Sequence, residues 1–260
     1  MSADACILLD TAGLNSFTRA RFEQYRNAMS GICEVYAVVH HPDAVRATDH
    51  QAKIVYLTNE QIFNEVEHSK DVSRGLIPGN LDLKKIRTVR EVPSYSRYIW
   101  IEYDVLCTSD FRSVVQNLLR VTEEVDFAAS FILPRQSYND DWMWWDSLKI
   151  PAELGLNASD IAVRAFLPLF VFSYSYILEF EKQLRLGWAG HSEVTMSTIA
   201  SLRGFKMLDI SRSDPPFTQY PQFNVVSLSG LEKNIPPFIH PVKDPKSQMK
   251  YEEIIRALRG

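Results

Sequence analysis

The nine residues RYIWIEYDV, from Arg97 to Val105, form an apolar run that ends in two carboxylates separated by one aromatic residue. Such a run is typical of a strand that is buried on both faces in the middle of a mostly parallel sheet. Glu102 and Asp104 have one residue between them, so their side chains point to the same side of an extended chain. Two acidic groups at the end of a central strand indicate a bound cation, usually one that carries a phosphate-bearing ligand. In the alternative interpretation the strand has reached solvent, and its acids cap the turn before the next helix.

The composition is that of an ordinary globular protein, with 46% hydrophobic and 23% charged residues among 260. A net charge of −4, without a run of basic residues, argues against nucleic acid as a partner. The three cysteines are widely spaced and indicate reduced packing residues rather than disulfides or a zinc site. The N-terminus lacks the pattern of a signal peptide, and the most apolar window, residues 165–180, is shorter than the roughly 20 residues of a membrane-spanning helix. We therefore expect a cytoplasmic protein with no transmembrane segment.

Strand-like and helix-like segments alternate along the chain. Strands are predicted at residues 5–9, 34–39, 52–57, 97–105, 126–132, 165–172 and 205–210. Helices are predicted at residues 16–29, 60–67, 81–92, 111–121, 174–186, 192–202 and 251–258. Pro168 predicts that the strand at residues 165–172 lies at an edge or contains a bulge. This order predicts an α/β protein, and no repeat or linker divides residues 1–260, so a single domain is expected.

Several common catalytic motifs are absent from the sequence. There is no GxGxxG after a strand and no GxxxxGK[ST], which removes most support for a dinucleotide site or a P-loop. There is also no GxSxG and no HExxH, the motifs of α/β-hydrolases and of a large class of zinc enzymes. The acidic pair after residue 101 is what remains as a candidate site.

With those motifs absent, the chain resembles the glycosyltransferases of the GT-A fold. Three motifs carry the resemblance: Trp-x-Glu-Tyr-Asp-Val at residues 100–105, the tryptophan-rich patch DWMWW at 141–145, and Gly-His-x-Glu at 190–193. In this fold an acidic DxD motif closes a central strand and holds a divalent ion against the diphosphate of a nucleotide-sugar, and this chain has ExD instead. The resemblance covers roughly residues 5–241. It implies a GT-A-like, Rossmann-like domain with a mixed, mostly parallel central sheet flanked by helices, a nucleotide-binding half at residues 1–104 and an acceptor-binding half at residues 105–260.

The resemblance also implies a metal and diphosphate site. Asp104 is expected to be a direct ligand of Mn²⁺ or Mg²⁺, and Glu102 to reach the metal through water or to bind the ribose. A hard cation of this kind takes one or two carboxylates together with substrate phosphates. His240 is expected as a further ligand and Lys243 as a phosphate contact, although a lone histidine is more often packed or solvated. Two other basic residues could take the phosphate role, Lys206 and Arg212.

Glu193 is the candidate catalytic base. In GT-A enzymes that invert the anomeric centre, an acid in this region deprotonates the acceptor hydroxyl, which needs a carboxylate within hydrogen-bond reach. The alternative is a first-turn glutamate that only complements the helix dipole. Asp140 and Asp141 are reserve candidates for the base.

The remaining site residues follow from position. Ligands of open α/β sheets lie over the carboxyl ends of the strands, which nominates four residues for the nucleotide: Asp10, Thr11, His40 and Thr58. Asp10 could equally cap the following turn. The acceptor is assigned to an aromatic wall with a neighbouring imidazole: Trp142, Trp144, Trp145 and His191. An aromatic core cluster is the alternative for the three tryptophans.

The function expected from the sequence is therefore metal-dependent, inverting transfer of a sugar from a nucleotide-sugar donor to a carbohydrate or other hydroxyl acceptor. The first alternative is a nucleotidyltransferase, but residues 10–16 have one glycine and no basic residue where such an enzyme has a basic, glycine-rich loop. The second is a non-catalytic relative that binds a nucleotide or a carbohydrate.

Overall fold

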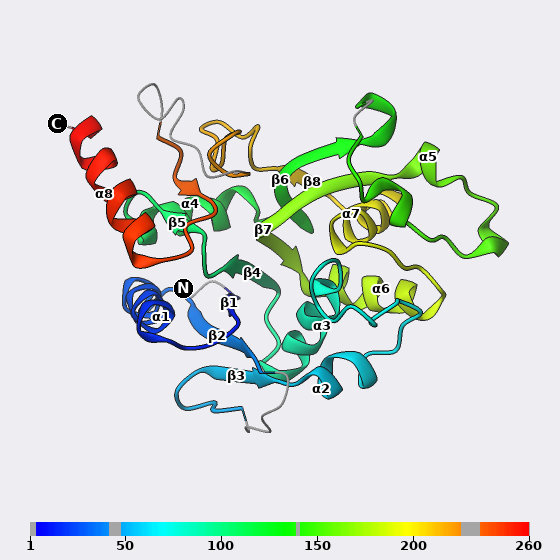
Figure 1. The fold of residues 1–260 in the computed structure, drawn as a ribbon, viewed down its shortest axis with the longest axis horizontal. Coiled ribbons are helices and arrows are strands. Elements are labelled where there is room, and N and C mark those ends of the chain that lie inside the picture. Colours follow the sequence, from blue (N-terminus) through cyan, green and yellow to red (C-terminus); the bar gives the residue numbers. More distant parts are fainter. Residues whose placement is uncertain (1–3, 42–47, 139–140, 225–234, 260) are drawn as a thin grey trace.

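The computed structural model describes residues 4–41, 48–138, 141–224 and 235–259. Its centre is a seven-stranded sheet in the order β3-β2-β1-β4-β7-β6-β8 (Figure 1). The strands are β1 (Ala5–Thr11), β2 (Glu34–His40), β3 (Ile54–Leu57), β4 (Arg97–Glu102), β6 (Phe127–Pro134), β7 (Val163–Ser173) and β8 (Met207–Asp209). The pairs β1·β2, β1·β4, β2·β3 and β6·β8 are parallel, whereas β7 runs antiparallel to both neighbours. The predicted mixed, mostly parallel sheet is confirmed.

Helices cover both faces of this sheet (Figure 1). One face packs against α1 (Ser16–Ala28) and α4 (Phe111–Val121). The other packs against α2 (Asn59–Asn64), α3 (Leu81–Glu91), α6 (Tyr174–Arg185) and α7 (Ser192–Leu202). The short helix α5 (Ala158–Ile161) precedes β7. Among the described residues, no helix has both the length and the apolar character needed to cross a bilayer.

Strand β4 lies between the two hydrophobic cores of the protein and contributes side chains to both. Tyr98 and Trp100 belong to the core under α3 and α6, and Ile99 and Ile101 belong to the core under α1 and α4. All four side chains are fully buried. Because successive strand residues face opposite sides, an apolar run without polar alternation is what a strand covered on both faces requires.

Pro168 lies in an interior strand, so the prediction of an edge position is wrong. β7 lies between β4 and β6. The alternative prediction, a bulge, is confirmed, because Ala129 of β6 pairs with Phe170 while the next residue, Ser130, pairs with Phe166. Proline cannot donate a ladder hydrogen bond, and here it falls where the β6–β7 ladder is interrupted.

The C-terminal segment departs from the sequence prediction in two ways. The last helix, α8 (Pro245–Arg259), begins six residues before the predicted start at residue 251. The Asp244 carboxylate accepts hydrogen bonds from the backbone N–H groups of Lys246 and Ser247, and a proline follows it, which together make a good helix start. An unpredicted pair of two-residue strands, β5 (Leu106–Cys107) and β9 (Phe238–Ile239), joins the end of the chain to its middle.

Candidate active site

The candidate site lies where the strand order reverses. From β1 the chain passes to β2 and β3 on one side of the sheet, and β4 is then added on the other side of β1. A crevice forms at the carboxyl ends of strands at such a switch point, and ligands of open α/β sheets bind there. Asp10 at the end of β1 is paired in register with Glu102 at the end of β4. Two carboxylates, from the neighbouring strands β1 and β4, therefore lie side by side at this crevice.

The turn after β4 is fixed from the α1 side. Arg21 of α1 donates a hydrogen bond to the carbonyl of Tyr103, and the hydroxyl of Tyr25 donates to the carbonyl of Val105 at 3.3 Å. These contacts hold the backbone on both sides of Asp104, whose side chain is 7% exposed. The position of the second carboxylate of the ExD motif is therefore set by helix packing as well as by the strand.

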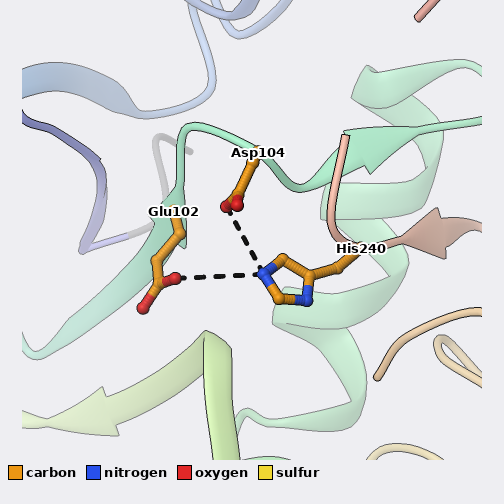
Figure 2. Close-up of side chains that lie close together, drawn as sticks. All are labelled: Glu102, Asp104 and His240. Carbon is orange, nitrogen blue, oxygen red and sulfur yellow. Dashed lines mark ion pairs between the residues drawn. The ribbon is translucent and has the colours of Figure 1, made fainter. Parts of the chain in front are cut away.

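His240 reaches the acidic pair because β9 pairs with β5, which directly follows the turn. The backbone N–H of Val242 also donates to the carbonyl of Asp104 at 2.7 Å. The His240 Nε2 atom lies 3.4 Å from Asp104 Oδ1 and 4.0 Å from Glu102 Oε2. Figure 2 shows this nitrogen facing both carboxylates.

These three side chains could hold a metal ion. One ligand atom of each lies within 4.8 Å of the other two. Asp104 Oδ1 is buried and has no hydrogen-bond partner in the described part of the chain. Burial, together with the nearby charge of Asp10, raises the pKa of Glu102 to about 7. An unpartnered buried carboxylate oxygen is costly, and two carboxylates with an imidazole are a donor set that suits Mn²⁺ or Mg²⁺.

Two lysines of α3 also reach the crevice, and the sequence interpretation missed both. Lys84 forms a buried ion pair with Asp10. The ammonium of Lys85 lies 4.6 Å from the centre of the Trp100 ring, its residue is 1% exposed, and no ion pair is found for it among the described residues. Burial lowers the pKa of Lys85, while the nearby Glu102 opposes that effect. Lysines in a helix usually indicate its solvent face, so the sequence carries no signal for this burial.

The four predicted nucleotide residues lie at the carboxyl ends of β1, β2 and β3. Asp10 is engaged by Lys84, and the hydroxyl of Thr11 donates to a backbone carbonyl two residues further on at 2.8 Å. His40 Nε2 lies 2.9 Å from an asparagine side chain, and burial lowers the pKa of its ring. The Thr58 side chain caps α2 in a reciprocal capping box. The structure thus brings these residues to one edge of the sheet, and Thr58 has a local structural role there.

A cavity of about 370 Å³ lies beside the metal-ligand candidates. Phe166 lines this cavity and contacts the His240 ring, with 5.4 Å between ring centres. The carboxylate of Glu193, at the start of α7, also lines it and lies close enough to the Leu167 backbone for that backbone to lower its pKa. The β7 bulge leaves Leu167 unpaired with β6, which fits this contact. Burial raises the pKa of Glu193 to about 7, although its side chain remains 18% exposed.

The tryptophan patch does not form one wall. Trp142 lines the cavity with Glu193, whereas Trp145 is buried in the core. Trp144 stacks on His191, with 4.5 Å between ring centres, beside a separate hollow of about 230 Å³. His191 Nδ1 accepts a hydrogen bond from the backbone N–H of Glu193 at 3.3 Å and so caps α7. Burial and the nearby Lys70 lower the pKa of His191 to about 4, so its ring is neutral at pH 7.

The other predicted residues lie outside this cluster. Lys243 and Asp141 are exposed. Lys206 is exposed and pairs with Glu124 at 3.1 Å. Arg212 lines the cavity, and Asp140 is outside the described residues.

Neither a family model nor a curated protein matches the sequence. Solved structures do resemble it. One is a glycosyltransferase involved in the glycosylation of the major capsid of PBCV-1, at 10% identity over 68% of this chain and 63% of that chain, with a TM-score of 0.34. Less than two thirds of that protein's length is therefore matched.

Two further solved structures resemble the chain. One is glucosyl-3-phosphoglycerate synthase from Mycobacterium tuberculosis in complex with Mg²⁺ and uridine diphosphate, at 12% identity over 71% of this chain and 67% of that chain, with a TM-score of 0.36. The other is mouse xyloside xylosyltransferase 1, at 9% identity over 80% and 85% of the two chains, also with a TM-score of 0.36. The identities and TM-scores are low, so any function assigned to this chain depends on the geometry of its own residues.

Proposed function

We propose that this chain is a GT-A-like glycosyltransferase that transfers a sugar from a nucleotide-sugar donor to a hydroxyl acceptor. The observation that carries the proposal is the cluster of Glu102, Asp104 and His240 at the switch point of the sheet, with a buried carboxylate oxygen that no described donor satisfies. A cavity with a candidate base opens directly beside it. Such a cluster suits a diphosphate-bearing ligand, and the cavity suits the molecule that attacks it.

The half of the chain up to residue 104 supplies most of the donor site. Asp104, Glu102 and His240 would hold Mn²⁺ or Mg²⁺, and when bound this ion supplies positive charge against the departing diphosphate. Lys85 adds a second positive charge from the α3 side. Its ammonium lies close enough to lower the pKa of both Glu102 and Glu193, so its charge acts on the metal-ligand cluster and on the candidate base.

The half from residue 105 supplies the acceptor site, with Glu193 as the base. The acceptor oxygen bonds to the anomeric carbon while the bond from that carbon to the diphosphate breaks and its electron pair leaves with the nucleoside diphosphate. The acceptor proton passes to Glu193. A base with a pKa of about 7 is well matched to this transfer near neutral pH. Attack from the cavity side, opposite the leaving diphosphate, inverts the anomeric centre.

Thermal stabilisation by a nucleoside diphosphate together with Mn²⁺ tests this proposal. UDP, GDP, ADP and CDP are screened with and without Mn²⁺, and one of them is expected to raise Tm only when the metal is present. A ligand at about 100 times its Kd stabilises by about 2.7 kcal/mol, which corresponds to roughly 5–10 °C in a protein of this size. Asp104→Asn should abolish the shift, because it removes the negative charge of the carboxylate whose Oδ1 atom no described donor satisfies.

The matched control is Asp160→Asn, which makes the same chemical change at an exposed position of α5. It should keep the full shift. A shift that persists in the Asp104→Asn protein would refute the metal assignment. Mn²⁺-dependent hydrolysis of the corresponding nucleotide-sugar would then separate an enzyme from a protein that only binds the nucleotide.

A further inference from the structure

Two arginines are among the residues that line the cavity beside the metal-ligand candidates. Four ionisable side chains with opposite charges line it: Arg164, Arg212, Glu193 and Asp209. Burial raises the pKa of Glu193 to about 7, so this carboxyl is only partly charged at neutral pH. Asp209 is the other acidic side chain in this lining, and it lies next to Arg212.

Asp209 is largely satisfied by its own surroundings. Its carboxylate accepts hydrogen bonds from the backbone N–H groups of Phe131 and Ile132, at 3.0 and 3.1 Å. It also accepts two from Ser211, at 2.9 Å from the backbone N–H and 2.6 Å from the hydroxyl. Arg212 Nε lies 3.5 Å from the same carboxylate, at the limit of a hydrogen bond. Four good donors disperse the negative charge of Asp209, and the guanidinium of Arg212 is only weakly engaged by it.

Arg212 lies at the rim of the cavity, and its contacts with Tyr138 and Asp209 use only part of its N–H donors. One Nη atom donates to the Tyr138 hydroxyl at 3.1 Å, and the side chain is 63% exposed. A guanidinium carries five N–H groups in a planar fork that matches a carboxylate or a phosphate. Within the described ranges, Asp209 and Tyr138 are the acceptors found for it.

Arg164 provides a second guanidinium in the lining of the cavity. It lies over the rings of Trp142 and Trp145, at 5.2 and 5.5 Å from the ring centres. Cation–π contacts of this kind orient the guanidinium. Its charge also reaches Glu193, whose pKa it lowers slightly against the larger effect of burial.

The backbone next to Asp209, at Phe131 in the cavity lining, is in a rare conformation. Phe131 has a φ of +55°, a left-handed value that costs a non-glycine residue of order 1 kcal/mol or more. The two hydrogen bonds from residues 131 and 132 to Asp209 hold it. Strain of this kind persists where the surrounding structure over-determines it, most often at a binding or catalytic site.

We propose that the acceptor of this chain carries an anionic group, a carboxylate or a phosphate, in addition to its reacting hydroxyl. Arg212 binds that group at the rim with support from Arg164, and this places the hydroxyl toward Glu193. The aromatic rings of Trp142 and Tyr220, which also line the cavity, pack against the body of the acceptor. The inference rests on the proposed glycosyltransferase function and assigns the class of acceptor within it.

The test compares three probes that share one ring and differ in their anionic group: glucose, glucuronate and glucose 6-phosphate. Calorimetric titration measures their binding to the protein saturated with Mn²⁺ and the nucleoside diphosphate that stabilises it. At least one anionic probe should bind about tenfold more tightly than glucose, as expected for a charge-assisted hydrogen bond. Arg212→Gln should remove that preference, and Arg212→Lys should restore only part of it.

The control is Lys206→Gln, which removes an exposed cation outside the cavity and should keep the preference. A preference for glucuronate alone identifies a carboxylate acceptor, and a preference for glucose 6-phosphate alone identifies a phosphate acceptor. Three results would overturn the inference: glucose binds as tightly as both anionic probes, neither anionic probe binds, or the preference for an anionic probe survives in Arg212→Gln. None of these results affects the Mn²⁺-dependent nucleotide binding, whose loss would instead refute the proposed function.

Discussion

Replacing Glu193 by glutamine should lower the rate of sugar transfer by a factor of about 10² to 10⁴ and, at pH 8, make the folded protein more stable. The rate falls because glutamine cannot accept the acceptor proton. The stability rises because the wild-type carboxylate is charged at pH 8 in a site that disfavours the charge. Glutamine keeps the size of the side chain and an oxygen that can accept a hydrogen bond.

The direction of the pH dependence follows from the raised pKa of Glu193. Burial raises it from 4.5 to about 7, so the folded state holds the proton more tightly than the unfolded state. The stability contributed by this group is fully present below pH 4.5 and is lost as the pH rises through 7. At pH 8 the charged carboxylate costs up to roughly 3 kcal/mol, which Glu193→Gln removes. In the wild type, kcat/KM should rise with pH and level off above about 7, as the base loses its proton.

Urea unfolding of both proteins at pH 5 and pH 8, with the pH profile of kcat/KM, measures these effects. The control is Glu60→Gln, which removes a glutamate from the first turn of α2 at an exposed position. It should change stability by only a few tenths of a kcal/mol and leave the profile unchanged. If Glu193→Gln behaved in the same way, Glu193 would be a helix-dipole residue and not the base.

The central sheet could be predicted because its strands carry local signals. Residues 98 to 101 are apolar without interruption, and the structure divides them between two cores. Their burial on both faces follows from the spacing of side chains along a strand and requires no long-range information. Pro168 likewise predicted an irregular position in β7, but it could not distinguish an edge strand from the bulge that is found.

The assembly of the site depends on long-range pairing that no local pattern reveals. His240 reaches Asp104 through β5 and β9, and strands of two residues are too short to show a periodicity. The resemblance, not the pattern, suggested His240. The tryptophan patch shows the same limit, because Trp142 lines the cavity while Trp145, three residues later, is buried in the core. Sequence proximity did not indicate which of these rings could meet a ligand.

Replacing Lys85 by methionine should lower kcat/KM for the nucleotide-sugar by about 100-fold and leave the ligand-free protein as stable as the wild type or more so. Lys85 is buried against Trp100, and no ion pair to it is found in the described part of the chain. A buried charge without a partner carries a desolvation cost, and an apolar side chain of similar volume removes that cost. The activity falls because the positive charge that acts on both Glu102 and Glu193 is lost.

The adjacent Lys84 provides a matched comparison, because the same substitution there should change the stability in the opposite direction. Its ammonium forms a buried ion pair with Asp10, so Lys84→Met leaves a buried carboxylate without a partner and should destabilise by about 3–5 kcal/mol. Urea unfolding without metal or nucleotide compares the two variants directly. If Lys85→Met were destabilised as strongly as Lys84→Met, Lys85 would serve as a structural counter-charge to Glu102. If the variant is stable but slow, the charge of Lys85 is retained for the donor, since no ion pair within the described ranges requires it.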